Sequence, residues 1–178
     1  ADAELIIHSK EKRQSAFPAT LNVLLVDDNP VNMVLNNKMM QSLIPKVQLT
    51  EMIDGLQALN ACKEEKFDLI LMDVQMPIMD GIESTKQIRQ LPQYTEVPII
   101  GVTAGNILGE KEKCLAAGMN DFLPKPLRQA DLLEKLLMHI TLNKTDSSTK
   151  TIDSDQYLDL DMMNERIGDD EEFRIMFL

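Results

Sequence analysis

Residues 21–30 read LNVLLVDDNP, an apolar run that ends in two adjacent carboxylates and a turn. Its first six residues are apolar apart from one Asn, which is typical of a parallel strand buried on both faces. Asn29 and Pro30 fit the cap and the first position of a helix. The segment therefore predicts a strand that carries Asp27 and Asp28 to the edge of a sheet, followed at once by a helix.

The rest of the domain repeats this alternation of strand and helix. The expected strands are residues 21–26, 47–50, 67–72, 98–102 and 121–124, and only 47–50 alternates between apolar and polar residues as an edge strand does. The expected helices are one with Val31, Val34, Leu35 and Met39 at helical spacing, then 55–64, 82–90, 107–117 and a last one with an apolar stripe over 132–140. Strands that alternate with helices predict right-handed crossovers and a parallel sheet covered on both faces.

Side chains with useful chemistry follow four of these strands. Asp27 and Asp28 follow the first strand, Asp73 the third, Thr103 the fourth and Lys125 the last. The carboxyl ends of parallel strands share one edge, so three carboxylates, a hydroxyl and an ammonium can converge there. Such a pocket is suited to phosphoryl transfer, with a hard divalent cation to relieve the repulsion between the carboxylates.

Five short segments, in this order and spacing, closely resemble the receiver domain of two-component response regulators, in the form carried by hybrid sensor histidine kinases. They are Asp27-Asp28-Asn29, Met72 to Pro77, Asp80-Gly81, Thr103-Ala104 and Lys125-Pro126. The resemblance spans about residues 20 to 140. It implies a flavodoxin-like, doubly wound α/β fold with five helices and a five-stranded parallel sheet in the order 2-1-3-4-5.

The resemblance also implies roles for the acidic residues. Asp73 would be the phosphoacceptor, attacking phosphorus in line to form an acyl phosphate. Asp28, Asp73 and the backbone carbonyl of Gln75 would bind Mg²⁺, with Mn²⁺ as an alternative ion, and Asp27 would act through a coordinated water. For the Asp-Asp-Asn segment alone, simple helix capping is the competing interpretation.

The remaining site residues would stabilise the phosphoryl group or change position in response to it. Lys125 would place its ammonium against a phosphoryl oxygen, and the resemblance implies a cis Lys125–Pro126 bond. Thr103 would donate its hydroxyl to another oxygen and move toward the phosphoryl group. Phe122 would then swing into the vacated space as the switch aromatic, although ordinary core burial also explains a Phe at this position.

Composition limits the partners. The net charge of -11 argues against a nucleic-acid partner. Cys62 and Cys114 lack the spacing of a disulfide or metal site and are interpreted as reduced thiols. No apolar run approaches the roughly 20 residues of a membrane span, so we expect a cytoplasmic segment without direct membrane contact, from a parent chain that could itself be anchored in the inner membrane.

The domain organisation is expected to have four parts. Residues 1–19 form a linker, 20–141 the receiver domain, and 142–156 a second linker. Residues 157–178 resemble the opening helices of a histidine phosphotransfer domain, cut off before its phosphorylatable histidine. This extension is expected to be helical, to dock or self-associate, and not to accept phosphate.

The expected function is that of a relay: the domain takes a phosphoryl group from a phosphohistidine of a kinase core and passes the signal on by a conformational switch or to a phosphotransfer histidine. The segment has no kinase chemistry of its own, and the parent chain would be a hybrid sensor kinase. One rival is a phosphatase of the haloacid dehalogenase type, but that family needs an Asp where this chain has Gln75. The other rival is an interaction module that works without phosphorylation.

Overall fold

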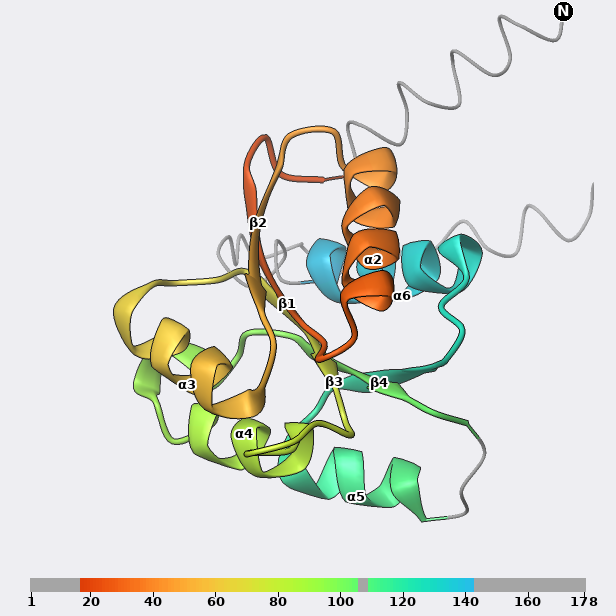
Figure 1. Cartoon of the computed structure of the whole chain (residues 1–178). Helices are drawn as coiled ribbons and strands as arrows, with labels where there is room; N and C mark the ends of the chain where they lie inside the picture. The colour runs from red at the N-terminus through yellow and green to blue at the C-terminus, as the bar shows by residue number, and fades with distance from the viewer. Residues whose placement is uncertain (1–16, 106–108, 143–178) are drawn as a thin grey trace, which may run out of the picture. The chain divides into compact units, whose positions relative to one another are not determined.

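The computed structural model describes residues 17–105 and 109–142. A five-stranded sheet has the order β2-β1-β3-β4-β5, and every neighbouring pair is parallel (Figure 1). The strands are β1 (Leu21–Val26), β2 (Val47–Met52), β3 (Leu69–Asp73), β4 (Ile99–Thr103) and β5 (Asp121–Pro124). The helices are α2 (Pro30–Leu43), α3 (Gly55–Glu64), α4 (Gly81–Ile88), α5 (Glu110–Ala117) and α6 (Gln129–Leu142). The predicted fold class and strand order are confirmed.

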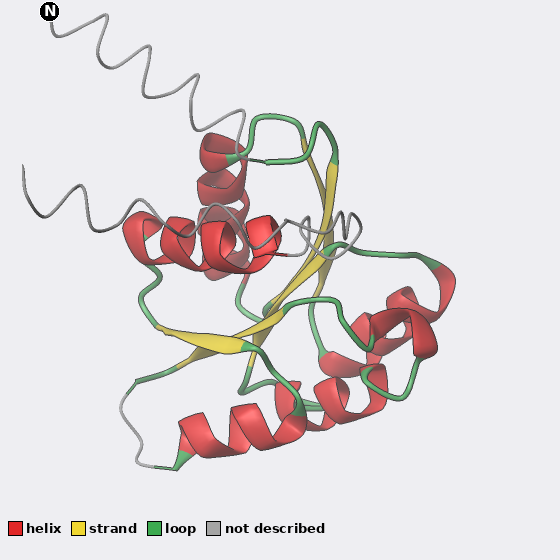
Figure 2. Cartoon of the chain, turned by 180° about the vertical axis from the view of Figure 1, so that it is seen from behind, coloured by secondary structure: helices red, strands yellow, loops and turns green. Residues whose placement is uncertain are grey.

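Helices cover both faces of the sheet (Figure 2). Val23 and Leu25 of β1 pack with α2 and α6, whereas Leu24 and Val26 pack with α3, α4 and α5. This alternation follows from the period of two in a strand, and it explains why the central strands are apolar throughout. Because helices cover both faces in the described part of the chain, a ligand can reach the sheet at the ends of its strands.

Some boundaries differ from the expected ones. The third strand begins two residues later than expected and includes Asp73, so the candidate acceptor is part of the sheet itself. A short 3-10 helix, Pro92–Tyr94, follows α4 and was not expected. Its Tyr94 is buried and donates to the carbonyl of Glu65 at 2.6 Å, a contact 29 residues away that local patterns do not reveal.

The inward face of α2 is not the one that its apolar spacing indicates. Val31, Val34 and Leu35 are 65%, 52% and 49% exposed. The helix instead buries Met33, Asn36 and Met40. Asn29 caps the helix, and the long unbranched side chains of Met33 and Met40 pack into the core over the sheet. An apolar patch therefore remains on the outside of α2.

The structure also corrects one end of the domain. Phe17 falls in the expected linker of residues 1–19, but its side chain is 5% exposed and belongs to the core beside α2 and α6. The packed domain thus begins before residue 20. Residues 1–16 of that linker and the expected linker 142–156, beyond its first residue, lie outside the described residues, as does the expected helical extension 157–178. No helix in the described part has both the length and the apolar character to cross a membrane.

Asp121 anchors α6 to the start of β5. Its Oδ2 lies 2.9 Å from Lys135 Nζ and 3.1 Å from His139 Nε2. Burial raises the pKa of Asp121, but the hydrogen bonds from His139 and Lys135 outweigh it and leave the pKa below its ordinary value. A lowered pKa in the folded state adds stability above the ordinary Asp pKa, and this stability is lost as the pH falls through the folded pKa.

Asp121→Asn should therefore lower the free energy of unfolding by about 1 kcal/mol at neutral pH. The difference from the wild type should shrink as the pH falls below about 4. Urea denaturation at a series of pH values measures both effects. Asp131→Asn is a matched control because its partner Arg128 is largely exposed; a pH-independent loss in the Asp121 variant would contradict the assignment.

Candidate functional site

The site lies where β1 and β3 end side by side. Val26 pairs with Met72 in the parallel register, so the next residue of each strand segment, Asp27 and Asp73, reaches the same edge. Both carboxylates are almost fully buried, at 2% and 3% exposure, while Asp28 is exposed. One carboxylate oxygen from each of these three residues lies within 4.8 Å of the others. The predicted acidic cluster is therefore formed.

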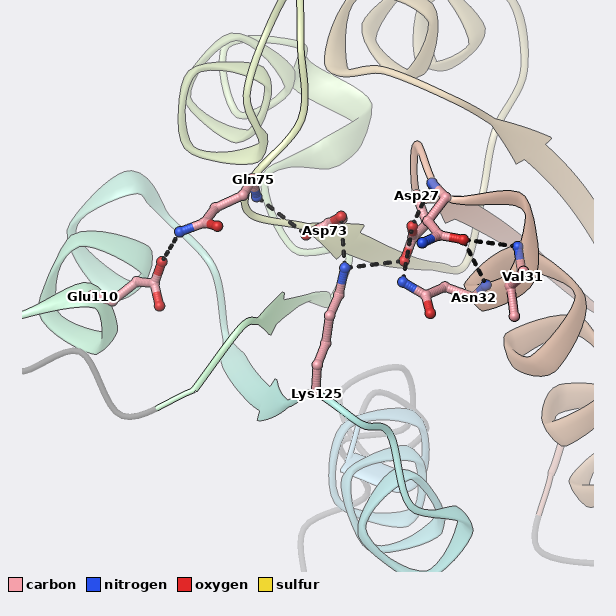
Figure 3. A network of polar contacts seen from close by, with 8 residues as sticks. Asp27, Val31, Asn32, Asp73, Gln75, Glu110 and Lys125 are labelled. Carbon is pink, nitrogen blue, oxygen red and sulfur yellow. Dashed lines mark hydrogen bonds and ion pairs between the residues drawn. The ribbon is translucent and has the colours of Figure 1, made fainter.

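Helix capping does not account for the acidic pair. Asn29 caps α2, accepting from the backbone N–H of Val31 at 2.9 Å. Asp27 Oδ1 accepts from the backbone N–H of Asn29 at 2.9 Å and the side chain of Asn32 at 3.4 Å (Figure 3). The other oxygen, Oδ2, is buried, and its partner among the described residues is the Lys125 ammonium, 3.3 Å away. It is left facing the cluster.

Lys125 joins the two buried carboxylates (Figure 3). Its Nζ lies 2.8 Å from Asp73 Oδ2 and 3.3 Å from Asp27 Oδ2. Its backbone N–H donates to the carbonyl of Thr103 at 2.7 Å, and the Lys125–Pro126 bond is cis, which confirms the prediction. The backbone of Lys125 is thus hydrogen-bonded to the end of β4, while its side-chain ammonium contacts Asp73 at the end of β3.

The charges of the cluster are coupled. Burial raises the pKa of Asp73; the Lys125 ammonium and the Gln75 backbone N–H oppose this rise without cancelling it, and the Asp27 charge adds to it. For Lys125, burial lowers the pKa, but Asp73 and Asp27 outweigh it and the pKa is raised. A single ammonium therefore faces more negative charge than it neutralises.

The donor set fits a hard divalent cation. Three carboxylates supply only oxygen ligands, as Mg²⁺ prefers, and the buried Asp27 Oδ2, held by a single long contact with Lys125, can also accept from a metal-bound water. Asp28 is exposed, so a cation that keeps several waters can be reached from solvent. The residues present fit Mg²⁺ on these grounds.

Three further predicted residues, Thr103, Gln75 and Phe122, lie on β4, in the loop after β3 and on β5. Thr103 is buried at the end of β4, one residue beyond the partner of Asp73 in the register. Gln75 donates its backbone N–H to Asp73 Oδ1 at 3.1 Å. Phe122 pairs with Gly101, two residues before Thr103 on β4, and is half-buried rather than part of the core.

Two residues at the start of α5 were not predicted. Glu110 Oε1 accepts from the side chain of Gln75 at 3.2 Å. The Lys111 ammonium lies 5.1 Å from the centre of the Phe122 ring. The two contacts join residues 35 and 11 positions apart on different elements, and nothing in the local sequence pattern of α5 distinguishes these two charges from the other charges of the helix.

Comparison with known proteins agrees with this geometry. A family profile described as "Response regulator receiver domain" matches residues 23–137. The chain is 41% identical over 134 residues to signal transduction histidine-protein kinase BarA of Escherichia coli K12, covering 72% of this chain and 14% of that protein. It is 42% identical over 118 residues to sensor histidine kinase GacS of Pseudomonas protegens, covering 65% of this chain and 13% of that protein. The chain thus spans only a small part of these relatives.

Two solved structures extend the comparison. One is the receiver domain of sensor histidine kinase PA1611 from Pseudomonas aeruginosa, with a magnesium ion coordinated in its active-site cleft. It is 41% identical, with a TM-score of 0.63 over 68% of this chain and 98% of that one. The other is the receiver domain of Ssk1 in complex with the phosphotransfer protein Ypd1 of Saccharomyces cerevisiae. It is 32% identical, with a TM-score of 0.64 over 71% of this chain and 92% of that one.

Proposed function

The chain belongs to the response regulator receiver family, and we propose that its Asp73 accepts the phosphoryl group in a two-component phosphorelay. One observation carries this proposal. The Asp73 carboxylate is buried at the end of β3, 2.8 Å from the Lys125 ammonium and beside two further carboxylates. A carboxylate held in this way combines a fixed nucleophile with a cation for the developing negative charge.

The reaction follows from these positions. An Asp73 oxygen attacks phosphorus, the phosphorus–nitrogen bond of a phosphohistidine breaks, and the imidazole leaves with the bonding pair. Lys125 would then exchange its ion pair with Asp73 for one with a phosphoryl oxygen, and the Thr103 hydroxyl would donate to another. Mg²⁺, held by Asp28, Asp73 and the Gln75 carbonyl and through water by Asp27, would neutralise charge on the acidic cluster and the incoming group.

Intact-mass spectrometry tests the function directly. The protein is incubated with acetyl phosphate, with and without Mg²⁺. We expect the mass of one added phosphoryl group per chain only when Mg²⁺ is present. Unmodified protein under these conditions would support the phosphorylation-independent interaction module instead.

Divalent-cation binding should depend on Asp28. Asp28→Ala should weaken Mg²⁺ binding by about tenfold or more, because it removes an oxygen ligand from a site of three carboxylates. Isothermal titration calorimetry with Mg²⁺, repeated with Mn²⁺, provides the measurement. Glu112→Ala removes the same charge from the exposed surface of α5 and should leave the affinity unchanged. Equal affinity in the wild type and the Asp28 variant would place the metal elsewhere.

The proposed partners are a histidine kinase core as phosphodonor and a histidine phosphotransfer domain as acceptor. The exposed apolar patch of Val31, Val34 and Leu35 begins three residues after Asp28, on the helix that leads away from the site. Ile78, in the loop after Asp73, is 81% exposed. Apolar side chains on two elements that flank the acceptor offer a docking surface for a helical partner.

Removing this patch should slow transfer from a protein donor but not from a small one. Val34→Ala combined with Leu35→Ala should lower the second-order rate constant of phosphoryl transfer from the protein donor by about tenfold. This factor corresponds to about 1.5 kcal/mol of lost apolar burial. The assay follows transfer from a phosphorylated phosphotransfer domain, with acetyl phosphate as the second donor. Leu115→Ala removes an exposed apolar side chain from α5, away from this patch, and serves as control. Equal losses with both donors would contradict a docking role.

The remaining proposals concern the parent chain. We propose that it is a hybrid sensor histidine kinase, since BarA and GacS each match over this domain. Residues 157–178 are proposed as the start of a phosphotransfer-like helical domain. Deleting residues 151–178 should leave phosphorylation of Asp73 intact.

A further inference from the structure

Gln75 makes two contacts that point in opposite directions. Its backbone N–H donates to Asp73 Oδ1, whereas its side chain turns away from the acceptor and donates to Glu110 on α5 (Figure 3). An ionised carboxylate accepts hydrogen bonds and donates none, so the Gln75 carboxamide contacts Glu110 through its Nε2 group. The carboxamide of Gln75, two residues after the acceptor, is therefore held by a contact with α5.

The space beside this contact is open to water. A cavity of about 650 Å³ lies there. Its wall includes Asp28, Gln75, Met76, Pro77, Asp80 and Glu110. The cavity thus connects a candidate metal ligand, the loop that follows the acceptor, and the first turn of α5. Gln75 and Glu110 both line this space, so a carboxamide released from Glu110 has solvent beside it.

A free carboxamide in this cavity has a definite chemical use. Hydrolysis of the acyl phosphate requires a water oxygen to attack phosphorus in line, while the phosphorus–oxygen bond to Asp73 breaks and the carboxylate leaves with the bonding pair. Inorganic phosphate forms, and the proton of the water passes to it or to solvent. A carboxamide both donates and accepts, so it can orient such a water, as a Gln does in small GTPases.

We propose that Glu110 is a positioning residue that holds the Gln75 carboxamide away from Asp73 and so lengthens the lifetime of the phosphorylated state. The inference rests on Asp73 being the phosphoacceptor. It adds a determinant of signal duration on α5, a helix that supplies none of the residues assigned to phosphoryl transfer. Glu110 is half-buried as the first residue of α5, where the helix dipole favours a negative charge.

Three substitutions separate the hydrogen bond from the charge. Glu110→Ala removes the acceptor, and the phosphorylated state should then decay about fivefold faster, the factor that corresponds to one ordinary hydrogen bond. Glu110→Gln keeps an acceptor oxygen and should decay at nearly the wild-type rate. Glu112→Ala removes a charge from the exposed face of the same helix and should have no effect.

The experiment phosphorylates the full chain with acetyl phosphate and Mg²⁺, removes the donor by desalting, and follows the loss of the phosphoryl mass with time. In a Gln75→Ala background, Glu110→Ala should no longer change the decay rate, because the carboxamide that it releases is absent. A merely structural role for Glu110 would leave its effect intact in that background and would overturn the proposal.

Failure of the inference can be told apart from failure of the proposed function. Without phosphoryl uptake in the wild type, Asp73 would not be an acceptor. With uptake but equal or slower decay in Glu110→Ala, or with Glu110→Gln as fast as Glu110→Ala, Glu110 would not act through Gln75. The NMR signals of the Gln75 side-chain NH₂ group give a readout without phosphate: they should shift in Glu110→Ala and remain unchanged in Glu112→Ala.

Discussion

Asp73→Asn is expected to abolish phosphoryl uptake completely. Asn keeps the size of the side chain but replaces the attacking oxygen anion with an amide, which cannot form a stable acyl phosphate. Asp27 and Asp28 do not substitute for it, because Asp27 is tied to the backbone of Asn29 and Asp28 follows the strand rather than ending it. Lys125 also lies closer to Asp73 than to Asp27.

Intact mass after treatment with acetyl phosphate or beryllofluoride measures the effect. Asp68→Asn is the matched control, since Asp68 is an exposed carboxylate next to the opposite end of β3. It should be modified as fully as the wild type. Stable modification of the Asp73 variant would move the acceptor to another carboxylate and remove the basis of the proposed function.

Gly81→Ala is expected to have the largest effect on folding. A Cβ on Gly81 would overlap the backbone oxygen of Asp73 and lie 2.9 Å from Met72 Cγ. The backbone N–H of Gly81 also donates to the carbonyl of Val74 at 3.0 Å, so α4 cannot easily move outward. Relief of the overlap must therefore displace the acceptor strand or break this contact, at a cost of about 3 kcal/mol.

Two measurements check this expectation. Urea denaturation should show the loss of stability, and acetyl phosphate should modify the variant more slowly because the Asp73 backbone has moved. Glu83→Ala, in the same first turn of α4 but exposed, should change stability by no more than about 0.5 kcal/mol. A Gly81 variant as stable and as reactive as the wild type would show that the close approach does not constrain the acceptor.

The fold could be predicted largely from sequence because its signals are local. A strand buried on both faces must be apolar throughout, so the runs that end at Val26 and Met72 stand out. Asn29-Pro30 marks the start of α2 for an equally local reason, since the cap contacts only the next turn. Helix rotation is not local, and the apolar spacing in α2 did not indicate which face of that helix is buried.

The exposed face of α2 illustrates the difference. Spacing alone groups Val31, Val34 and Leu35 on one side, but it does not say whether that side faces the sheet or a partner. Arg89 is a second case: its guanidinium donates to the carbonyls of Gly118 and Val97 and so joins α4, α5 and the segment before β4. A charged residue at the end of a helix gives no such indication in sequence.

The order of residues along the chain already specifies which chemistry is available: carboxylates, a hydroxyl and an ammonium at strand ends, in an order that parallel strands bring to one edge. The tertiary structure alone decided how these groups are connected. It pairs Lys125 with both Asp73 and Asp27, and it turns the Gln75 side chain toward Glu110. The physical reason is that strand and helix signals arise from neighbours in the chain, whereas ion pairs and hydrogen bonds between elements depend on distances that exist only after the sheet has formed.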